Sequence, residues 1–167
     1  MSAIRQLALT GRARYGLDSP DLDRFASDQR AHRSNLWGTE MAKKAGACII
    51  LIVEDYADSR TLLSSLLRGK GYKVVEARDG KEGLRQATQV KPDLILMDLV
   101  MPEMNGVEAT RQLRQRQTLS QTPIFAISSY ATGDLKEDAI AAGCSEVFAK
   151  PLDIESLLGR IKATLGS

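Results

Sequence analysis

The sequence has few histidines and cysteines and no long apolar run. Its 167 residues include 1 histidine and 2 cysteines, Cys48 and Cys144, which lie far apart. These residues exclude a tetrahedral zinc site and a disulfide framework, so we expect two reduced thiols. No apolar run approaches the roughly 20 residues of a membrane helix, and the first residues lack the apolar centre of a signal peptide. We therefore expect a cytoplasmic protein without membrane insertion.

An excess of charge of one sign is also missing. The chain has 23 Lys and Arg against 21 Asp and Glu, for a formal net charge of +2. Residues 1–46 contain 8 basic and 5 acidic side chains, and residues 47–167 contain 15 and 16. A dedicated nucleic-acid binder would present a clustered basic face. The nearly neutral main part argues against direct nucleic-acid binding.

Residues 1–46 differ in pattern from the rest of the chain. They show weak periodicity and are rich in Arg, Ser, Asp and Gly, whereas a continuous apolar run begins at Ala47. We expect residues 1–46 to be a flexible N-terminal extension and residues 47–167 to form one domain. A docking arm built on Phe25, Leu36 and Trp37 is the alternative for the extension.

The main domain alternates short apolar runs with helical patterns. The runs predict strands at 47–53, 72–77, 93–98, 123–128 and 146–149. The periodic segments predict helices at 59–68, 79–90, 105–115 and 135–142, and a last helix whose stripe runs from Ile154 to Leu165. Leu62, Leu63, Leu66 and Leu67 recur at helical spacing in the first helix. Five strands alternating with five helices predict an α/β fold whose parallel sheet is covered on both faces.

Polar residues gather where the predicted strands end. Glu54 and Asp55 follow the first strand, Asp98 ends the third, Ser128 ends the fourth, and Lys150 follows the fifth. In open parallel sheets, ligands bind outside the carboxyl ends of the strands. A single Asp or Lys at such a position is usually a turn or capping residue. Five suitable residues in order at successive strand ends indicate a site.

The residue types at this rim suit phosphoryl transfer. Three neighbouring carboxylates raise one another's pKa unless a cation lies among them. Hard oxygen ligands on one side of a cleft suit Mg²⁺, and a carboxylate can act as a nucleophile that forms an aspartyl phosphate. Such a reaction needs positive charge around the transferring group, and a lysine and Mg²⁺ supply it.

Four segments resemble the motifs of the response-regulator receiver family. They are 50–55 (ILIVED), 93–106 (DLILMDLVMPEMNG), 123–131 (PIFAISSYA) and 141–151 (AAGCSEVFAKP). The resemblance runs from about Ala47 to Leu165 and implies a flavodoxin-like (βα)5 fold with strand order 2-1-3-4-5. It also implies a signalling protein of a two-component or phosphorelay system, not an enzyme acting on a separate substrate.

By this resemblance, Asp98 is the phosphoacceptor. Glu54 and Asp55 correspond to the acidic pair that holds Mg²⁺, together with Asp98 and the backbone carbonyl of Val100. Ser128 corresponds to the hydroxyl residue that moves toward the phosphoryl group. Lys150 corresponds to the lysine that pairs with that group, and the resemblance implies a cis peptide bond before Pro151.

The chain departs from the family three residues before the lysine, where Val147 replaces a common Tyr or Phe. We expect Phe148 to face the core and Ser128 to act through repacking of the following helix. The implied phosphodonor is a histidine kinase or a histidine phosphotransfer protein. We expect no output domain after Leu165. We therefore expect a downstream protein to bind the face formed by the fourth helix, fifth strand and fifth helix.

The sequence leaves a relay role open and argues against two other functions. The protein could pass its phosphoryl group onward to a histidine phosphotransfer protein, as a relay intermediate. A small-molecule phosphatase with an aspartyl nucleophile needs a second acid two residues after it, where this chain has Val100. A phosphorylation-independent interaction module would be indicated by loss of the acceptor or the acidic pair, and both are present.

Overall fold

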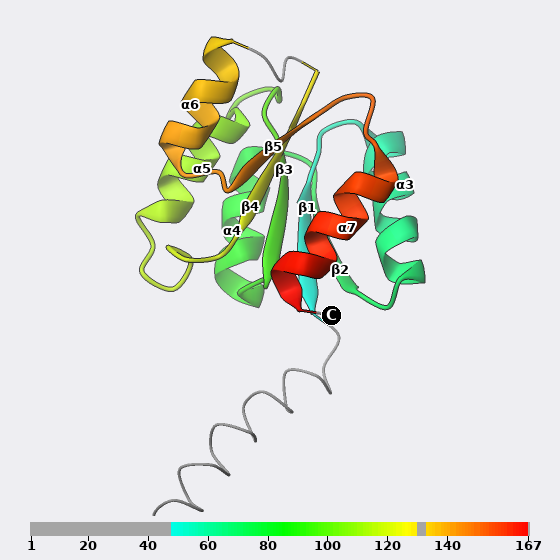
Figure 1. Ribbon diagram of the computed structural model, residues 1–167. Helices are drawn as coiled ribbons and strands as arrows, with labels where there is room; N and C mark the ends of the chain where they lie inside the picture. Colours follow the sequence, from blue (N-terminus) through cyan, green and yellow to red (C-terminus); the bar gives the residue numbers. More distant parts are fainter. Residues whose placement is uncertain (1–47, 130–132, 167) are drawn as a thin grey trace, which may run out of the picture. The chain divides into compact units, whose positions relative to one another are not determined.

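The computed structural model describes residues 48–129 and 133–166. In these ranges, five parallel strands form one sheet in the order β2-β1-β3-β4-β5, and five helices connect and follow them (Figure 1). The strands are β1 (Ile49–Val53), β2 (Lys73–Ala77), β3 (Leu94–Asp98), β4 (Ile124–Ser128) and β5 (Glu146–Ala149). The helices are α3 (Ala57–Gly69), α4 (Gly80–Val90), α5 (Gly106–Arg114), α6 (Asp134–Ala142) and α7 (Ile154–Leu165). The predicted flavodoxin-like fold and its strand order are confirmed.

Some expectations from the sequence fall outside this part of the chain. The extension at 1–46 and its alternative docking arm lie outside the described residues, and so does the end of the segment 123–131. Among the described helices, none is long and apolar enough to cross a membrane.

Helices cover both faces of the sheet. One buried cluster includes Leu84 of α4, Leu113 of α5 and Ala139 of α6, so these three helices share a face. A second cluster includes Leu67 of α3 and Ile161 of α7 on the opposite face. The two layers are visible on either side of the strands in Figure 1.

The central strands are apolar except at the carboxyl ends of β3 and β4, because each face of the sheet meets a helix layer. In β1, Leu51 and Val53 join the α4–α6 cluster, whereas Ile50 and Ile52 join the α3–α7 cluster. Strand β3 alternates in the same way and is buried along its whole length. This is the reason that these strands read as continuous hydrophobic runs in the sequence.

The element bounds agree with the sequence prediction to within two residues, and the leucines at helical spacing in α3 differ in burial. Leu62 is 65% exposed, whereas Leu63 and Leu67 are buried and Leu66 is partly buried. Successive helix positions are about 100° apart, so Leu62 lies beyond the edge of the buried stripe. Leu62 thus shares the helical spacing of the other three leucines but not their burial.

The register of the sheet determines which residues meet at its carboxyl edge. Val53 pairs with Met97, and Asp98 pairs with Ile127. The residue after Val53 therefore lies beside Asp98. Ser128 pairs with Ala149, which places Lys150 next to the end of β4. These residues therefore all lie at the carboxyl edge of the sheet.

The loop after β3 packs closely against the start of α5. The Gly106 amide donates to the Leu99 carbonyl at 3.1 Å. A Cβ at Gly106 would lie only 2.1 Å from the carbonyl oxygen of Asp98, so the chain cannot accept a larger residue there without moving. This glycine lets α5 begin directly against the backbone of Asp98.

We predict opposite effects for alanine at two helical glycines. Gly106→Ala should lower the free energy of unfolding by about 1–3 kcal/mol, because the new methyl group overpacks the β3–α5 connection. Gly159→Ala is the control, because the space around its Cβ in α7 is open. It should raise the free energy of unfolding by about 0.5–1 kcal/mol. Urea denaturation tests both, and a neutral or stabilising Gly106→Ala would contradict the close packing.

Candidate functional site

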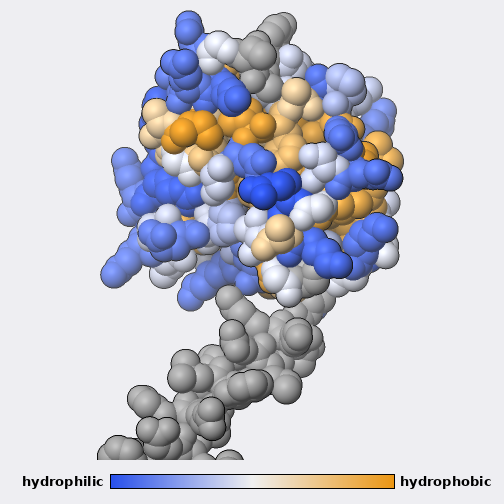
Figure 2. Space-filling view, viewed as in Figure 1, coloured by the Kyte–Doolittle hydropathy of each residue, from blue (hydrophilic) through white to orange (hydrophobic). Residues whose placement is uncertain are grey.

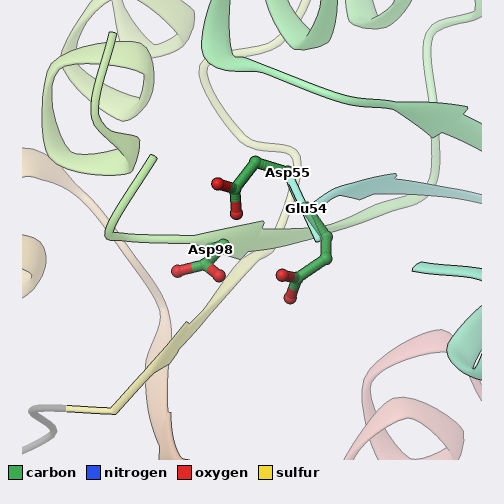
Figure 3. Close-up of side chains that lie close together, drawn as sticks. All are labelled: Glu54, Asp55 and Asp98. Carbon is green, nitrogen blue, oxygen red and sulfur yellow. The ribbon is translucent and has the colours of Figure 1, made fainter. Parts of the chain in front are cut away.

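Three carboxylates meet at the carboxyl edge of the sheet. Glu54, Asp55 and Asp98 each offer an oxygen, and these oxygens all lie within 4.8 Å of one another. Figure 3 shows the three side chains turned toward a common space. Glu54 and Asp98 are buried, at 2% and 4% exposure, whereas Asp55 is exposed. The prediction from the sequence that these three residues lie close together is thus confirmed.

Lys150 joins the two buried carboxylates. Its Nζ donates to Oε2 of Glu54 at 2.9 Å and to Oδ2 of Asp98 at 2.5 Å. The lysine follows β5, and its backbone amide donates to the Ser128 carbonyl at 2.8 Å. The Lys150–Pro151 peptide bond is cis, as the resemblance implied. One ammonium group therefore neutralises part of the charge of two acids from different strands.

Burial and neighbouring charge shift the titration of this pair. Burial raises the pKa of Glu54, the hydrogen bond from Lys150 lowers it, and the charge of Asp98 raises it again; the net shift is upward. Burial lowers the pKa of Lys150, but its bonds to Asp98 and Glu54 outweigh that effect, so its pKa is raised overall. The lysine is therefore held in its charged form at neutral pH.

Asp98 is fixed from two sides. Its Oδ1 accepts the backbone N–H of Val100 at 2.8 Å, while its Oδ2 accepts Lys150. The Val100 side chain is 53% exposed beside this loop. The bond to Val100 holds the backbone just beyond Asp98 close to the acidic cluster. The metal contact expected from the Val100 carbonyl stays a prediction.

Ser128 occupies the buried end of β4. It is fully buried, and its backbone carbonyl is the acceptor for Lys150 N–H. The register places it one residue beyond the pair formed by Asp98 and Ile127. The structure thus places Ser128 at the same edge as the acids. The role expected of its hydroxyl group stays a prediction.

Val147, which stands where the family commonly has Tyr or Phe, and its neighbour Phe148 lie on opposite faces of β5. Val147 packs against the α4–α6 cluster, and Phe148 packs against the α3–α7 cluster. The Phe148 ring lies 5.4 Å from that of Phe125, centroid to centroid. Phe148 therefore faces the core, as predicted.

Sequence reasoning missed Arg60. Its Nη1 donates to the Glu54 carbonyl at 2.7 Å and to the Asp55 carbonyl at 3.3 Å. The available signal was its place near the start of a helix, where the helix dipole favours acids and disfavours a cation. A basic residue there suggests a specific partner.

The donor set fits a small hard cation. Carboxylate oxygens are the ligands that Mg²⁺ prefers, and Mg²⁺ binds through one or two carboxylates while it keeps several waters. When all three acids are ionised, the single Lys150 charge leaves a surplus of two negative charges. The exposure of Asp55 gives solvent ions access to the cluster.

Comparison with known proteins agrees with this geometry. The family model of the response regulator receiver domain matches residues 50–162. The chain belongs to the response regulator receiver family. It is 33% identical over 117 residues to the polar-differentiation response regulator DivK of Brucella anthropi, covering 70% of this chain and 95% of that protein.

Solved receiver structures share the fold. Vibrio cholerae chemotaxis protein CheY4 matches with a TM-score of 0.68 and 29% identity, covering 71% of this chain and 99% of that one. The receiver domain of the Pseudomonas aeruginosa sensor histidine kinase PA1611 matches with a TM-score of 0.68 and 32% identity, covering 73% of this chain and 100% of its own. That structure has a magnesium ion coordinated in its active-site cleft. Receiver domains bind Mg²⁺ at an acidic pocket and interact with histidine kinases or phosphotransfer proteins, and this receiver domain has such an acidic cluster.

We predict that Lys150→Met destabilises the receiver domain in a pH-dependent way. Removing the ammonium leaves two buried carboxylates unpaired. Breaking a fully buried pair costs roughly 3–5 kcal/mol, and partial exposure of Lys150 should reduce this to about 2 kcal/mol at neutral pH. An acid with a raised pKa in the folded state destabilises that state as pH rises, and without Lys150 the pKa of Glu54 rises further. The loss should therefore shrink as pH falls toward about 5.

Urea denaturation in the presence of a metal chelator measures this effect. Lys162→Met, at an exposed lysine of α7, controls for the loss of one positive charge. Equal stability of Lys150→Met and wild type at neutral pH, or a difference that does not change with pH, would contradict the ion-pair account.

Proposed function

We propose that this receiver domain accepts a phosphoryl group on Asp98 from a phosphohistidine of a histidine kinase or histidine phosphotransfer protein. The observation that carries the proposal is the buried Asp98 carboxylate, held between the Lys150 ammonium and the Val100 amide beside two further acids. An Asp that served only to cap a turn would not need a charged partner from a distant strand. Membership of the receiver family supports the same role.

In the proposed reaction, an oxygen of Asp98 forms a bond to phosphorus as the phosphorus–nitrogen bond to the donor imidazole breaks. The imidazole leaves with the electron pair of that bond, and an aspartyl phosphate remains. Glu54, Asp55, Asp98 and the Val100 carbonyl would hold Mg²⁺. When bound, Mg²⁺ neutralises charge on the phosphoryl oxygens.

Lys150 and Ser128 have different proposed roles. The Lys150 ammonium exchanges its contact with the free Asp98 carboxylate for one with the phosphoryl oxygens. Ser128, buried at the end of the neighbouring strand, donates its hydroxyl hydrogen to the same group. The protein then catalyses only its own phosphorylation and dephosphorylation, and it is not an enzyme acting on a separate substrate.

The proposed output surface is the face formed by α6, β5 and α7. Ser128 lies at the end of β4, and α6 is the next helix along the chain, so repacking there reaches this face. Figure 2 shows hydrophobic surface between α6 and β5, and Ile140 of α6 is 47% exposed. A downstream protein binding here would read the phosphorylated state. Transfer onward to a histidine phosphotransfer protein remains the alternative, and a cytoplasmic location stays a prediction.

Phosphorylation by acetyl phosphate tests the proposed acceptor. The wild-type chain, incubated with acetyl phosphate and MgCl₂, should gain the mass of one phosphoryl group, measured by intact mass spectrometry. The gain should disappear with chelator and in Asp98→Asn, because the nucleophile is then an amide. Asp138→Asn, at an exposed aspartate of α6, is the control that should label normally. Absence of label in the wild type, or equal label in Asp98→Asn, would contradict the proposal.

A further inference from the structure

The guanidinium of Arg60 contacts the backbone of both residues of the acidic pair. Arg60 is the fourth residue of α3, and its Nη1 donates to the Glu54 carbonyl at 2.7 Å and to the Asp55 carbonyl at 3.3 Å. Its side chain is only 19% exposed. These contacts are with peptide groups, so they constrain the direction in which the Glu54 and Asp55 side chains leave the backbone.

The short connection between β1 and α3 explains why these carbonyls use a side-chain partner. Strand β1 ends at Val53 and helix α3 begins at Ala57. The Glu54 amide still donates to the Ala77 carbonyl of the sheet, at 3.1 Å. Backbone groups beyond a strand end need other partners when they are shielded from water. Arg60 thus holds the carbonyl side of Glu54, and the sheet holds its amide side.

Arg60 also forms an ion pair with Glu76 of strand β2. Its Nε lies 3.8 Å from Oε2 of Glu76. The other oxygen of Glu76 accepts the Ser64 hydroxyl at 2.7 Å and Arg68 at 3.0 Å. Glu76 pairs with Ile52 in the sheet register, two residues before Glu54. This arrangement links α3 and β2 to the loop that carries the acidic pair.

We propose that Arg60 is a positioning residue for the metal site, acting through the peptide groups of Glu54 and Asp55. The inference rests on the proposed Mg²⁺-dependent function and extends it to a residue that touches neither the ion nor the phosphoryl group. Partners that orient metal ligands usually change metal affinity by about 10–100-fold when they are removed. The solvent exposure of Asp55 places the expected effect near the lower end, at about tenfold.

Arg68 is the matched control. It lies on the same helix and contacts the same Glu76 carboxylate, and its second contact is with the Val74 carbonyl at 3.3 Å. Arg68→Met therefore removes a similar charge and a similar salt bridge to Glu76. Its contacts lie with β2, away from the acidic pair. A general loss of stability through Glu76 should affect both variants, whereas lost positioning should affect only Arg60→Met.

The test is an NMR titration of the full chain with MgCl₂, following backbone amide shifts in ¹H–¹⁵N spectra. The same spectra report whether each variant is folded. Arg60→Met should raise the dissociation constant for Mg²⁺ about tenfold, and Arg68→Met should leave it within about twofold of wild type. Arg60→Lys keeps the charge and a donor, so its constant should fall between those of wild type and Arg60→Met.

The outcomes separate this inference from the proposed function. A wild-type chain whose shifts do not respond to MgCl₂ refutes the metal-dependent function and the role of Arg60 with it. If wild type binds, an unchanged constant in Arg60→Met, or an equal loss in Arg68→Met, overturns the positioning role alone. If Arg60→Met loses the dispersed spectrum of a folded protein, the Arg60→Lys variant provides the test instead. A dissociation constant for Mg²⁺ equal to that of wild type in Arg60→Lys would then overturn the inference.

Discussion

The ion pair between Lys150 and the two buried acids is the interaction on which the functional site depends. The sheet register forces Glu54 and Asp98 together, because each follows one member of the Val53–Met97 pair. The negative charges of two neighbouring carboxylates repel each other, which opposes folding unless a cation lies between them. Lys150 supplies one positive charge to both, and the exposed Asp55 completes a cluster whose three ionised acids exceed that charge by two. A divalent cation would balance these two negative charges. The charge of the acidic cluster therefore favours a divalent cation as its ligand.

The backbone around the cluster keeps these charges in place. Gly106 allows α5 to begin against the carbonyl of Asp98, and the Val100 amide holds an oxygen of the same residue. On the other strand, Arg60 holds the carbonyls of the acidic pair. Contacts with main-chain atoms thus complement the Lys150 ion pairs in holding the acidic cluster.

The sequence predicted the strands well because a sheet covered on both faces makes the central strands apolar up to their carboxyl ends, as in Leu94–Met97 of β3. It predicted that Glu54, Asp55 and Asp98 lie close together, because parallel strands bring their carboxyl ends to one edge. Two features needed coordinates. Leu62 is one residue from the buried stripe, and spacing alone did not reveal on which side the stripe ends. Arg60 acts through backbone carbonyls, and a partner of main-chain atoms leaves no pairing pattern between side-chain types.

Thermal unfolding with and without MgCl₂, for wild type and Asp55→Asn, tests the charge account most directly. Ionic strength is matched with NaCl, so that only specific binding contributes. Wild type should unfold at a temperature higher by about 3 °C or more in millimolar MgCl₂, because the ion binds the folded state. Asp55→Asn keeps both Lys150 contacts but loses one negative charge. It should be at least as stable as wild type without Mg²⁺ and lose most of the Mg²⁺ effect. A wild type insensitive to Mg²⁺, or an Asp55→Asn variant with the full shift, would contradict the account.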